Sequence, residues 1–115
     1  MPQPKPIECD VLVIGAGMAG MAAALFAANR GQAVIQVGIP GEIIYASGLF
    51  DVLGVHPIEK RRLWRNPWAA VAAVSRDMPN HPYAKTSADN IQKAFREFLS
   101  FLAETGLPYR RYKKS

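Results

Sequence analysis

The sequence predicts an α/β fold, a parallel βαβ unit followed by helices, on three observations. Branched and bulky residues at 11–14 are typical of a buried strand, and good helix formers fill 21–28. Three glycines lie between these two segments. A second short apolar run, 33–37, follows soon after the helix formers. Strand, turn, helix and strand in this order are typical of a βαβ unit.

The first strand and helix together are also a candidate membrane span, because residues 11–28 carry no charged side chain. Two features argue against a span. Glu8 and Asp10 precede the run, where a signal peptide would carry positive charge. The run also changes midway from branched residues to alanine-rich sequence. We therefore expect a strand buried on both faces, then a separate helix, and no transmembrane segment.

The first helix is expected to run for about thirteen residues after the glycines. Asn29 and Arg30 lie in its last turn, and Gly31 stands where a glycine commonly ends a helix. The second strand is expected over 33–37.

The glycines match the pattern G-x-G-x-x-G between a strand and a helix. Gly15 permits the tight turn, Gly17 lets a pyrophosphate approach the backbone, and Gly20 lets the helix pack near the sheet. Unpaired N–H groups and the helix dipole would then bind the anion. The alternative is that the glycines serve packing alone. The pattern predicts a Rossmann-like unit with these cofactor-binding residues: Gly15, Ala16, Gly17, Met18, Ala19, Gly20, Val37 and Gly38.

One part of the dinucleotide-binding pattern is absent. The acidic residue that holds the adenosine ribose normally ends the second strand, but Gly38 stands there. Gln36 and Glu42 lie nearby, and neither fits the pattern. A backbone or water contact could replace the carboxylate, or the adenosine half could be held differently.

Two further helices are expected. Asn66 and Pro67 are typical of a helix start, and the helix should run to about Arg76. Its inner side is expected to contain Trp68, as a packing anchor, with Val71, Ala72 and Ser75.

The last helix should start near Ser87, capped by Thr86 or Ser87, and end at Gly106. Its apolar residues recur at helical spacing: Ile91, Ala94, Phe95, Phe98, Leu99, Phe101 and Leu102. This stripe is expected to form core or a face between subunits.

The net charge of +5 comes from two clusters: Lys60, Arg61, Arg62 and Arg65, and then Arg110, Arg111, Lys113 and Lys114. Neither cluster follows a helical face or alternates with stacking aromatics, so we expect a solvated loop and tail and no nucleic-acid partner. Anionic lipid or an acidic partner is the alternative.

Little in the sequence indicates metal or nucleophilic chemistry. Cys9 is the only cysteine, which excludes an internal disulfide and a thiolate metal site and suits a reducing compartment. His56 and His81 lack ligand spacing, and His81 is expected to be a turn residue. The sequence identifies no catalytic base.

The order of shorter motifs after the glycine pattern resembles the family of B subunits of anaerobic glycerol-3-phosphate dehydrogenase. That family follows the glycine motif with Ser-Gly, then Asp and Leu, then His-Pro-Tyr, and then a helix ending in Glu-(Ser/Thr)-Gly. This chain carries, in that order, Ser47, Gly48, Asp51, Leu53, His81, Pro82, Tyr83, Glu104, Thr105 and Gly106.

The resemblance implies a flavin-binding subunit of a membrane-associated complex that oxidises glycerol 3-phosphate to dihydroxyacetone phosphate and passes electrons to quinone. It implies FMN, whereas the pyrophosphate motif favours FAD, so the flavin is left as FAD or FMN. Ser47 and Gly48 match a loop that related flavoproteins place against the ribityl-phosphate side; an ordinary turn is the alternative. Other subunits would be partners, in the cytoplasm, with contact to the cytoplasmic membrane through them.

The expected organisation is a βαβ flavin-binding unit over 1–48, a loop and short helix over 49–86, and an amphipathic helix with a basic tail over 87–115. Two parallel strands do not complete a doubly wound sheet. We therefore expect an incomplete domain, the N-terminal piece of a larger flavoprotein, which alone binds cofactor weakly and catalyses nothing. The alternatives are another two-domain FAD-dependent oxidoreductase resembling fumarate reductase, or a nucleotide-binding fragment that docks on a partner.

Overall fold

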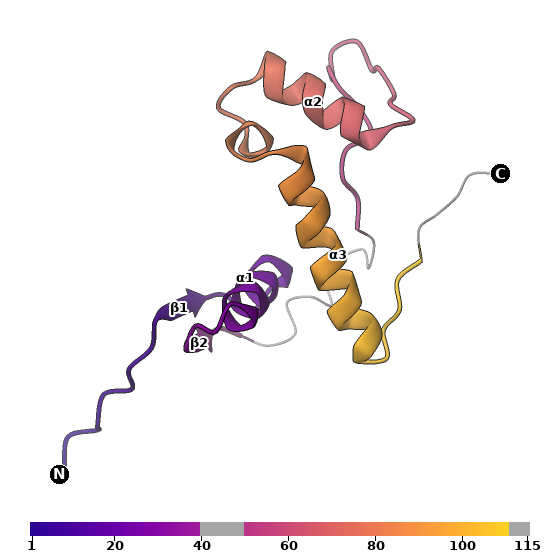
Figure 1. Ribbon diagram of the computed structural model, residues 1–115. Helices are drawn as coiled ribbons and strands as arrows, with labels where there is room; N and C mark the ends of the chain where they lie inside the picture. The colour runs from indigo at the N-terminus through magenta and orange to yellow at the C-terminus, as the bar shows by residue number, and fades with distance from the viewer. Residues whose placement is uncertain (40–49, 111–115) are drawn as a thin grey trace. The chain divides into compact units, whose positions relative to one another are not determined.

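The structure is a computed structural model that describes residues 1–39 and 50–110. The chain divides into two compact units, Met1–Leu49 and Phe50–Ser115, and each is described by itself. Figure 1 shows the elements in chain order. Unit 1 contains β1 (Val11–Ile14), α1 (Met18–Asn29) and β2 (Val34–Val37); unit 2 contains α2 (Pro67–Asp77), the 3₁₀ helix η2 (Pro82–Lys85) and α3 (Ala88–Glu104).

Unit 1 is a parallel βαβ unit. Val11 in β1 lies opposite Val34 in β2, and the register continues to the last residue of each strand. Helix α1 connects the strands and contacts both of them. Residues 11–28 are thus a strand, a turn and a helix, and the predicted α/β fold is confirmed. Across the described ranges, the helices are all too short or too polar to cross a membrane.

The end of α1 follows the predicted pattern. Arg30 donates its N–H to the carbonyl oxygen of Ala27 at 3.0 Å, and Gly31 adopts φ +76°. A positive φ costs glycine little, so this position turns the chain back toward β2.

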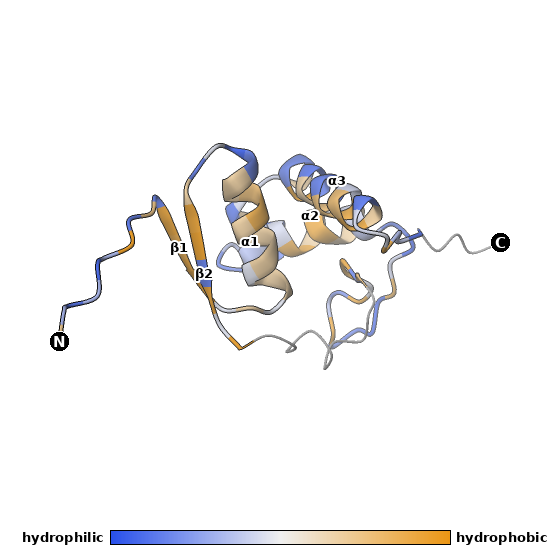
Figure 2. Cartoon of the chain, turned by 90° about the horizontal axis from the view of Figure 1, so that it is seen from below, coloured by the Kyte–Doolittle hydropathy of each residue, from blue (hydrophilic) through white to orange (hydrophobic). Residues whose placement is uncertain are grey.

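One face of the two-stranded sheet is open. Leu12 and Ile14 are 55% and 82% exposed, while Val11 and Val13 are half-buried on the side of α1. Figure 2 shows both strands as largely hydrophobic. The expectation of a strand buried on both faces is therefore wrong for the described residues, because a two-stranded sheet with one covering helix leaves its second face uncovered.

The two helices of unit 2 begin with side-chain caps. Asn66 accepts hydrogen bonds from the N–H groups of Trp68 (3.0 Å) and Ala69 (3.3 Å) at the start of α2. Ser87, and not Thr86, caps α3 by accepting from the N–H of Asn90 at 3.1 Å. Each cap satisfies amides that lack a partner within the helix.

The core of unit 2 lies between α2 and α3. Its buried apolar residues are Ala70, Val71, Ala73 and Val74 from α2, with Phe98 and Leu102 from α3. The predicted inner face of α2 is wrong at Ala72, which is exposed. Ser75 is half-buried and donates its hydroxyl to the carbonyl oxygen of Tyr83 at 3.0 Å. A helix rich in alanine and valine does not itself mark which side faces a partner.

Aromatic rings extend this core. Phe50 packs edge-on against Phe95, Phe98 and Tyr109, with ring centroids 6.3, 5.7 and 4.6 Å away. Trp68 also meets Phe95 edge-on at 6.3 Å. Trp68 is thus a packing anchor, as predicted.

A hairpin loop, residues 54–65, precedes α2. Val55 and Leu63 form an antiparallel bridge, and the N–H of Arg61 closes the turn on the carbonyl oxygen of Ile58 at 2.9 Å. We call this segment the basic hairpin, because it contains the first cationic cluster of the sequence.

Candidate cofactor-binding site

The turn between β1 and α1 begins with a glycine that other residues cannot readily replace. Gly15 has φ +129°, and a Cβ there would meet nothing within 4 Å. The dihedral angle, and not a lack of space, therefore requires glycine. The N–H of Gly15 donates to the carbonyl oxygen of Val37 at 2.7 Å, which joins the turn to the end of β2.

Gly20 lets the first turn of α1 lie against the strand. A Cβ at Gly20 would overlap the carbonyl oxygen of Gly15 and lie 2.9 Å from its carbonyl carbon. Any larger residue would push the helix away from the turn. This close contact is the role that the sequence pattern predicts for the third glycine.

Gly38, like Gly20, has no room for a side chain. A Cβ at Gly38 would lie 2.6 Å from the N atom and 2.9 Å from the Cβ of Ala16. The turn therefore occupies the space that a side chain at the end of β2 would need. This packing explains why the carboxylate expected at this position is absent.

Gln36 holds the turn from the other side, although the sequence pattern predicted no role for it. Its side-chain Nε2 donates to the carbonyl oxygen of Gly15 at 2.9 Å. The same Nε2 atom would lie 3.4 Å from a Cβ at Gly20, so the bond uses space that this glycine leaves free. The signal in the sequence that could have indicated this role is a polar residue, Gln36, within an otherwise apolar strand.

The start of α1 has no side-chain cap, and its first turn contains no acidic residue. The first intrahelical bond runs from the N–H of Met21 to the carbonyl oxygen of Gly17 at 3.0 Å. The amides of Met18, Ala19 and Gly20 precede it and have no acceptor within the helix. They also lie at the positive end of the helix dipole, which favours an anion by about 0.3–1 kcal/mol.

These features fit a phosphate-bearing cofactor. The turn brings Gly15 and Ala16 next to Val37 and Gly38 from β2, so eight predicted site residues gather at one end of the unit. Uncapped amides at a glycine turn can donate several hydrogen bonds to a diphosphate. Two other predicted residues, Ser47 and Gly48, lie outside the described residues.

The histidines of unit 2 have structural partners. His81 Nδ1 accepts from the N–H of Tyr83 at 3.1 Å, which is the turn role predicted for it. His56 is buried, and its Nε2 lies 3.0 Å from a carboxylate oxygen of Asp77. The hydrogen bonds with His56 and then Arg76 hold the pKa of Asp77 below its ordinary value of 3.8. In residues 1–39 and 50–110, no group of three or more ligating side chains suits a metal ion.

Known proteins resemble this chain over most of its length. A protein from Aliivibrio fischeri, named as the B subunit of anaerobic glycerol-3-phosphate dehydrogenase, is 33% identical over 101 residues, covering 86% of this chain and 22% of that protein. Proteins of the same name from Vibrio cholerae and Vibrio vulnificus are 34% and 32% identical, covering 86% and 89% of this chain and 22% and 23% of theirs. The predicted resemblance is confirmed, although the chain spans only about a fifth of these relatives. No solved structure matches the chain significantly.

A family model gives the cofactor. Residues 10–115, which include the whole βαβ unit, match the family described as FAD binding domain. The prediction of a flavin cofactor is confirmed, and FAD is the flavin that the description names. With a match over nearly its entire length, this chain belongs to the FAD binding domain family.

Proposed function

We propose that the start of α1 and the end of β2 bind the diphosphate of FAD. The observation that carries the proposal is the uncapped start of α1 behind a turn that only glycine can form at Gly15. The residues proposed to hold the cofactor are Gly15, Ala16, Gly17, Met18, Ala19, Gly20, Val37 and Gly38.

Each part of the chain has a distinct role in this site. The amides of Met18, Ala19 and Gly20 donate to phosphate oxygens. Gly17 keeps side-chain atoms away from the phosphates, and Gln36 fixes the Gly15 carbonyl so that the turn keeps its shape. Ser47 and Gly48 are proposed, from the sequence alone, to contact the ribityl-phosphate side.

For the whole protein we propose the activity in the names of its relatives, oxidation of glycerol 3-phosphate. The secondary alcohol becomes the ketone of dihydroxyacetone phosphate, and two electrons and two protons leave the substrate. Bound flavin supplies an acceptor for these two electrons, which a quinone then receives. The other subunits of the dehydrogenase complex are the proposed partners, at the inner face of the cytoplasmic membrane.

Backbone amide shifts in nuclear magnetic resonance test the phosphate site even if binding by the chain alone is weak. We expect FAD, FMN and ADP to shift the amide signals of residues 16–20, and riboflavin, which has no phosphate, to leave them unchanged. FAD should act at lower concentration than FMN if both halves of the dinucleotide are bound. Equal shifts from riboflavin, or none from FAD, would contradict the proposal.

A chimera tests the activity. This chain would replace the matching fifth of the Aliivibrio fischeri protein, co-expressed with its partner subunits, and glycerol 3-phosphate oxidation would be measured with a quinone acceptor. We expect retained oxidation, with flavin in the purified complex. A chimera that assembles and holds flavin but does not oxidise glycerol 3-phosphate would favour another FAD-dependent oxidoreductase. Assembly without redox activity or flavin would favour a docking module.

A further inference from the structure

Two exposed apolar surfaces of the chain differ in charge. The open sheet face of unit 1 presents Leu12 and Ile14, and no charged residue lies within either strand. The basic hairpin of unit 2 exposes Ile58 (74%) and Leu63 (79%) within a segment rich in lysine and arginine. An uncharged face suits packing inside a protein, whereas cations are costly to bury there.

We propose that the basic hairpin is a docking surface for an anionic membrane. Ile58 and Leu63 would enter the headgroup region, and the surrounding cations would bind lipid phosphates. The proposal concerns direct contact by this chain and is independent of the flavin site.

The strand pairing directs apolar side chains outward. Val55 and Leu63 lie opposite each other in the antiparallel bridge, so their side chains share one face of the hairpin. Their neighbours His56 and Trp64 belong to the other face, where His56 is 8% exposed and Trp64 is half-buried. The hairpin therefore has an inner polar-aromatic face and an outer aliphatic face.

Hydrogen bonds fix this orientation. Trp64 donates its indole N–H to the carbonyl oxygen of His56 at 2.6 Å, and the His56 side chain bonds to Asp77 at the end of α2. These bonds attach the inner face of the hairpin to α2, so the orientation of the outer face is fixed before a partner binds. A surface that is already ordered loses less conformational entropy on binding.

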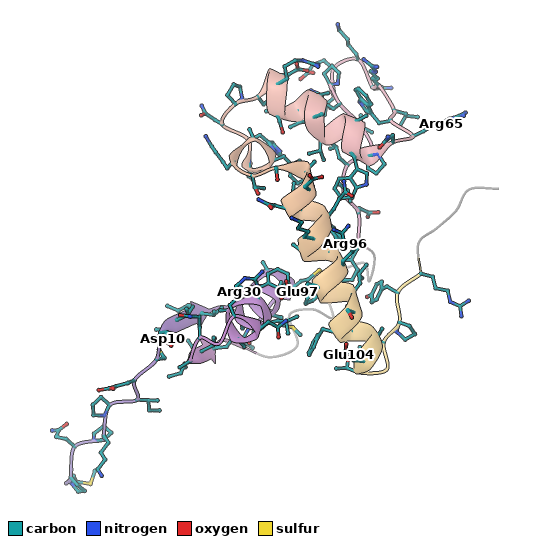
Figure 3. The ribbon with its side chains drawn as sticks, viewed as in Figure 1. Asp10, Arg30, Arg65, Arg96, Glu97 and Glu104 are labelled. Atoms are coloured by element: carbon teal, nitrogen blue, oxygen red, sulfur yellow. The ribbon has the colours of Figure 1, made fainter. Side chains whose placement is uncertain are left out.

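The cations are close neighbours of the aliphatic residues in the sequence of the hairpin. Residues 54–65 contain Lys60, Arg61, Arg62 and Arg65 against the single acid Glu59, a net charge of +3. Figure 3 shows the Arg65 side chain pointing away from α2. Each Lys or Arg near an anionic bilayer strengthens binding by about fivefold.

The same residues are less suited to nucleic acid. The Arg62 guanidinium lies 4.1 Å from the centroid of the Trp64 ring and covers it, and the indole N–H is already bonded. Arg62 therefore already occupies one face of the Trp64 ring, which leaves less aromatic surface on which a base could stack. Its exposed apolar side chains are aliphatic, which suits lipid.

Vesicle co-sedimentation of the purified chain tests the proposal. We expect binding to phosphatidylcholine vesicles that contain phosphatidylglycerol, little binding to phosphatidylcholine alone, and weaker binding at high salt. Absence of binding to the anionic vesicles would overturn the proposal.

Variants locate the binding surface. The triple variant Lys60→Gln, Arg61→Gln, Arg65→Gln should weaken binding by about 100-fold. The double variant Ile58→Ser, Leu63→Ser should also weaken it by about 100-fold. The matched control, Lys85→Gln, Lys93→Gln, Arg96→Gln, removes the same charge from positions elsewhere in unit 2. Circular dichroism would verify that each variant folds.

Equal losses in the hairpin and control triple variants would overturn the proposal, since binding would then follow net charge alone. A hairpin-dependent complex with a DNA duplex or an acidic protein that is tighter than the vesicle complex would overturn it in favour of that partner. A selective loss in both hairpin variants would support it.

Discussion

The start of α1 differs from the starts of α2 and α3 in what satisfies its amides. Asn66 caps α2, and Ser87 caps α3, which also has Asp89 in its first turn. α1 has neither a side-chain cap nor an acid there. In a capped helix, a side chain of the chain itself accepts hydrogen bonds from the first backbone N–H groups. At the start of α1 no side-chain cap does so, and these N–H groups can donate to a bound anion. The contrast separates two helices whose starts are completed by the chain's own side chains from the one whose start is proposed to bind phosphate.

The largest effect is expected from filling the space at Gly20. In Gly20→Ala the Cβ would overlap the Gly15 carbonyl oxygen, so the turn must move and FAD binding should fall at least about tenfold. Overpacking should also destabilise unit 1 by about 1–3 kcal/mol. Amide-shift titration with FAD and chemical denaturation measure the two effects.

Gly54→Ala is the matched control, because a Cβ at Gly54 meets nothing within 4 Å. Its FAD affinity should equal that of the unmodified chain. A Gly20→Ala variant that binds FAD equally well would show that this close contact does not shape the site.

The next largest effect is expected from giving α1 the cap that it lacks. Gly17 has φ −76° and ψ −178°, an extended conformation that aspartate adopts at helix starts. Gly17→Asp should weaken FAD binding about tenfold relative to Gly17→Ala, because its charge repels the diphosphate. The same substitution should raise the free energy of unfolding by about 0.5–2 kcal/mol over Gly17→Ala. Equal affinities in the two variants would mean that phosphate binds elsewhere.

Removing a cap from unit 2 should change stability alone. Asn66→Ala leaves the amides of Trp68 and Ala69 without their acceptor and should cost about 1 kcal/mol. FAD-induced shifts in residues 16–20 should be unchanged. If Asn66→Ala altered FAD binding as strongly as Gly17→Asp, the distinction between structural and binding helix starts would be lost.

The smallest effect is expected at Asp77, whose pKa is lowered first by its hydrogen bond with His56 and then by the one with Arg76. Because the folded pKa lies below the unfolded one, this bonding stabilises unit 2 above the unfolded pKa. That stabilisation is lost as the pH falls through the folded pKa. The Asp77→Asn variant should therefore be less stable than the unmodified chain at neutral pH. It should also lose less stability than the unmodified chain as the pH falls. Melting temperatures measured across the acid range would show this, and identical acid profiles would argue against the bond.

Local signals in the sequence were enough to predict several elements. Branched residues at 11–14, the cap at Asn66 and the glycines at Gly31 and Gly106 predicted a strand and three helix ends that the structure contains. These signals act over a few residues through steric limits on φ and ψ and through capping bonds. The G-x-G-x-x-G pattern correctly predicted the turn between β1 and α1, and the cofactor site at this turn stays a prediction.

The shape of the site depends on contacts between segments that are distant in the sequence. Gly38 lacks a side chain because Ala16 fills its space, and Gln36 bonds to Gly15 across 21 positions of sequence. The side of α2 that is buried and the exposure of Leu12 likewise depend on which other elements pack against α2 and β1. Contacts of this kind depend on where the chain returns in space, which no short window of sequence encodes.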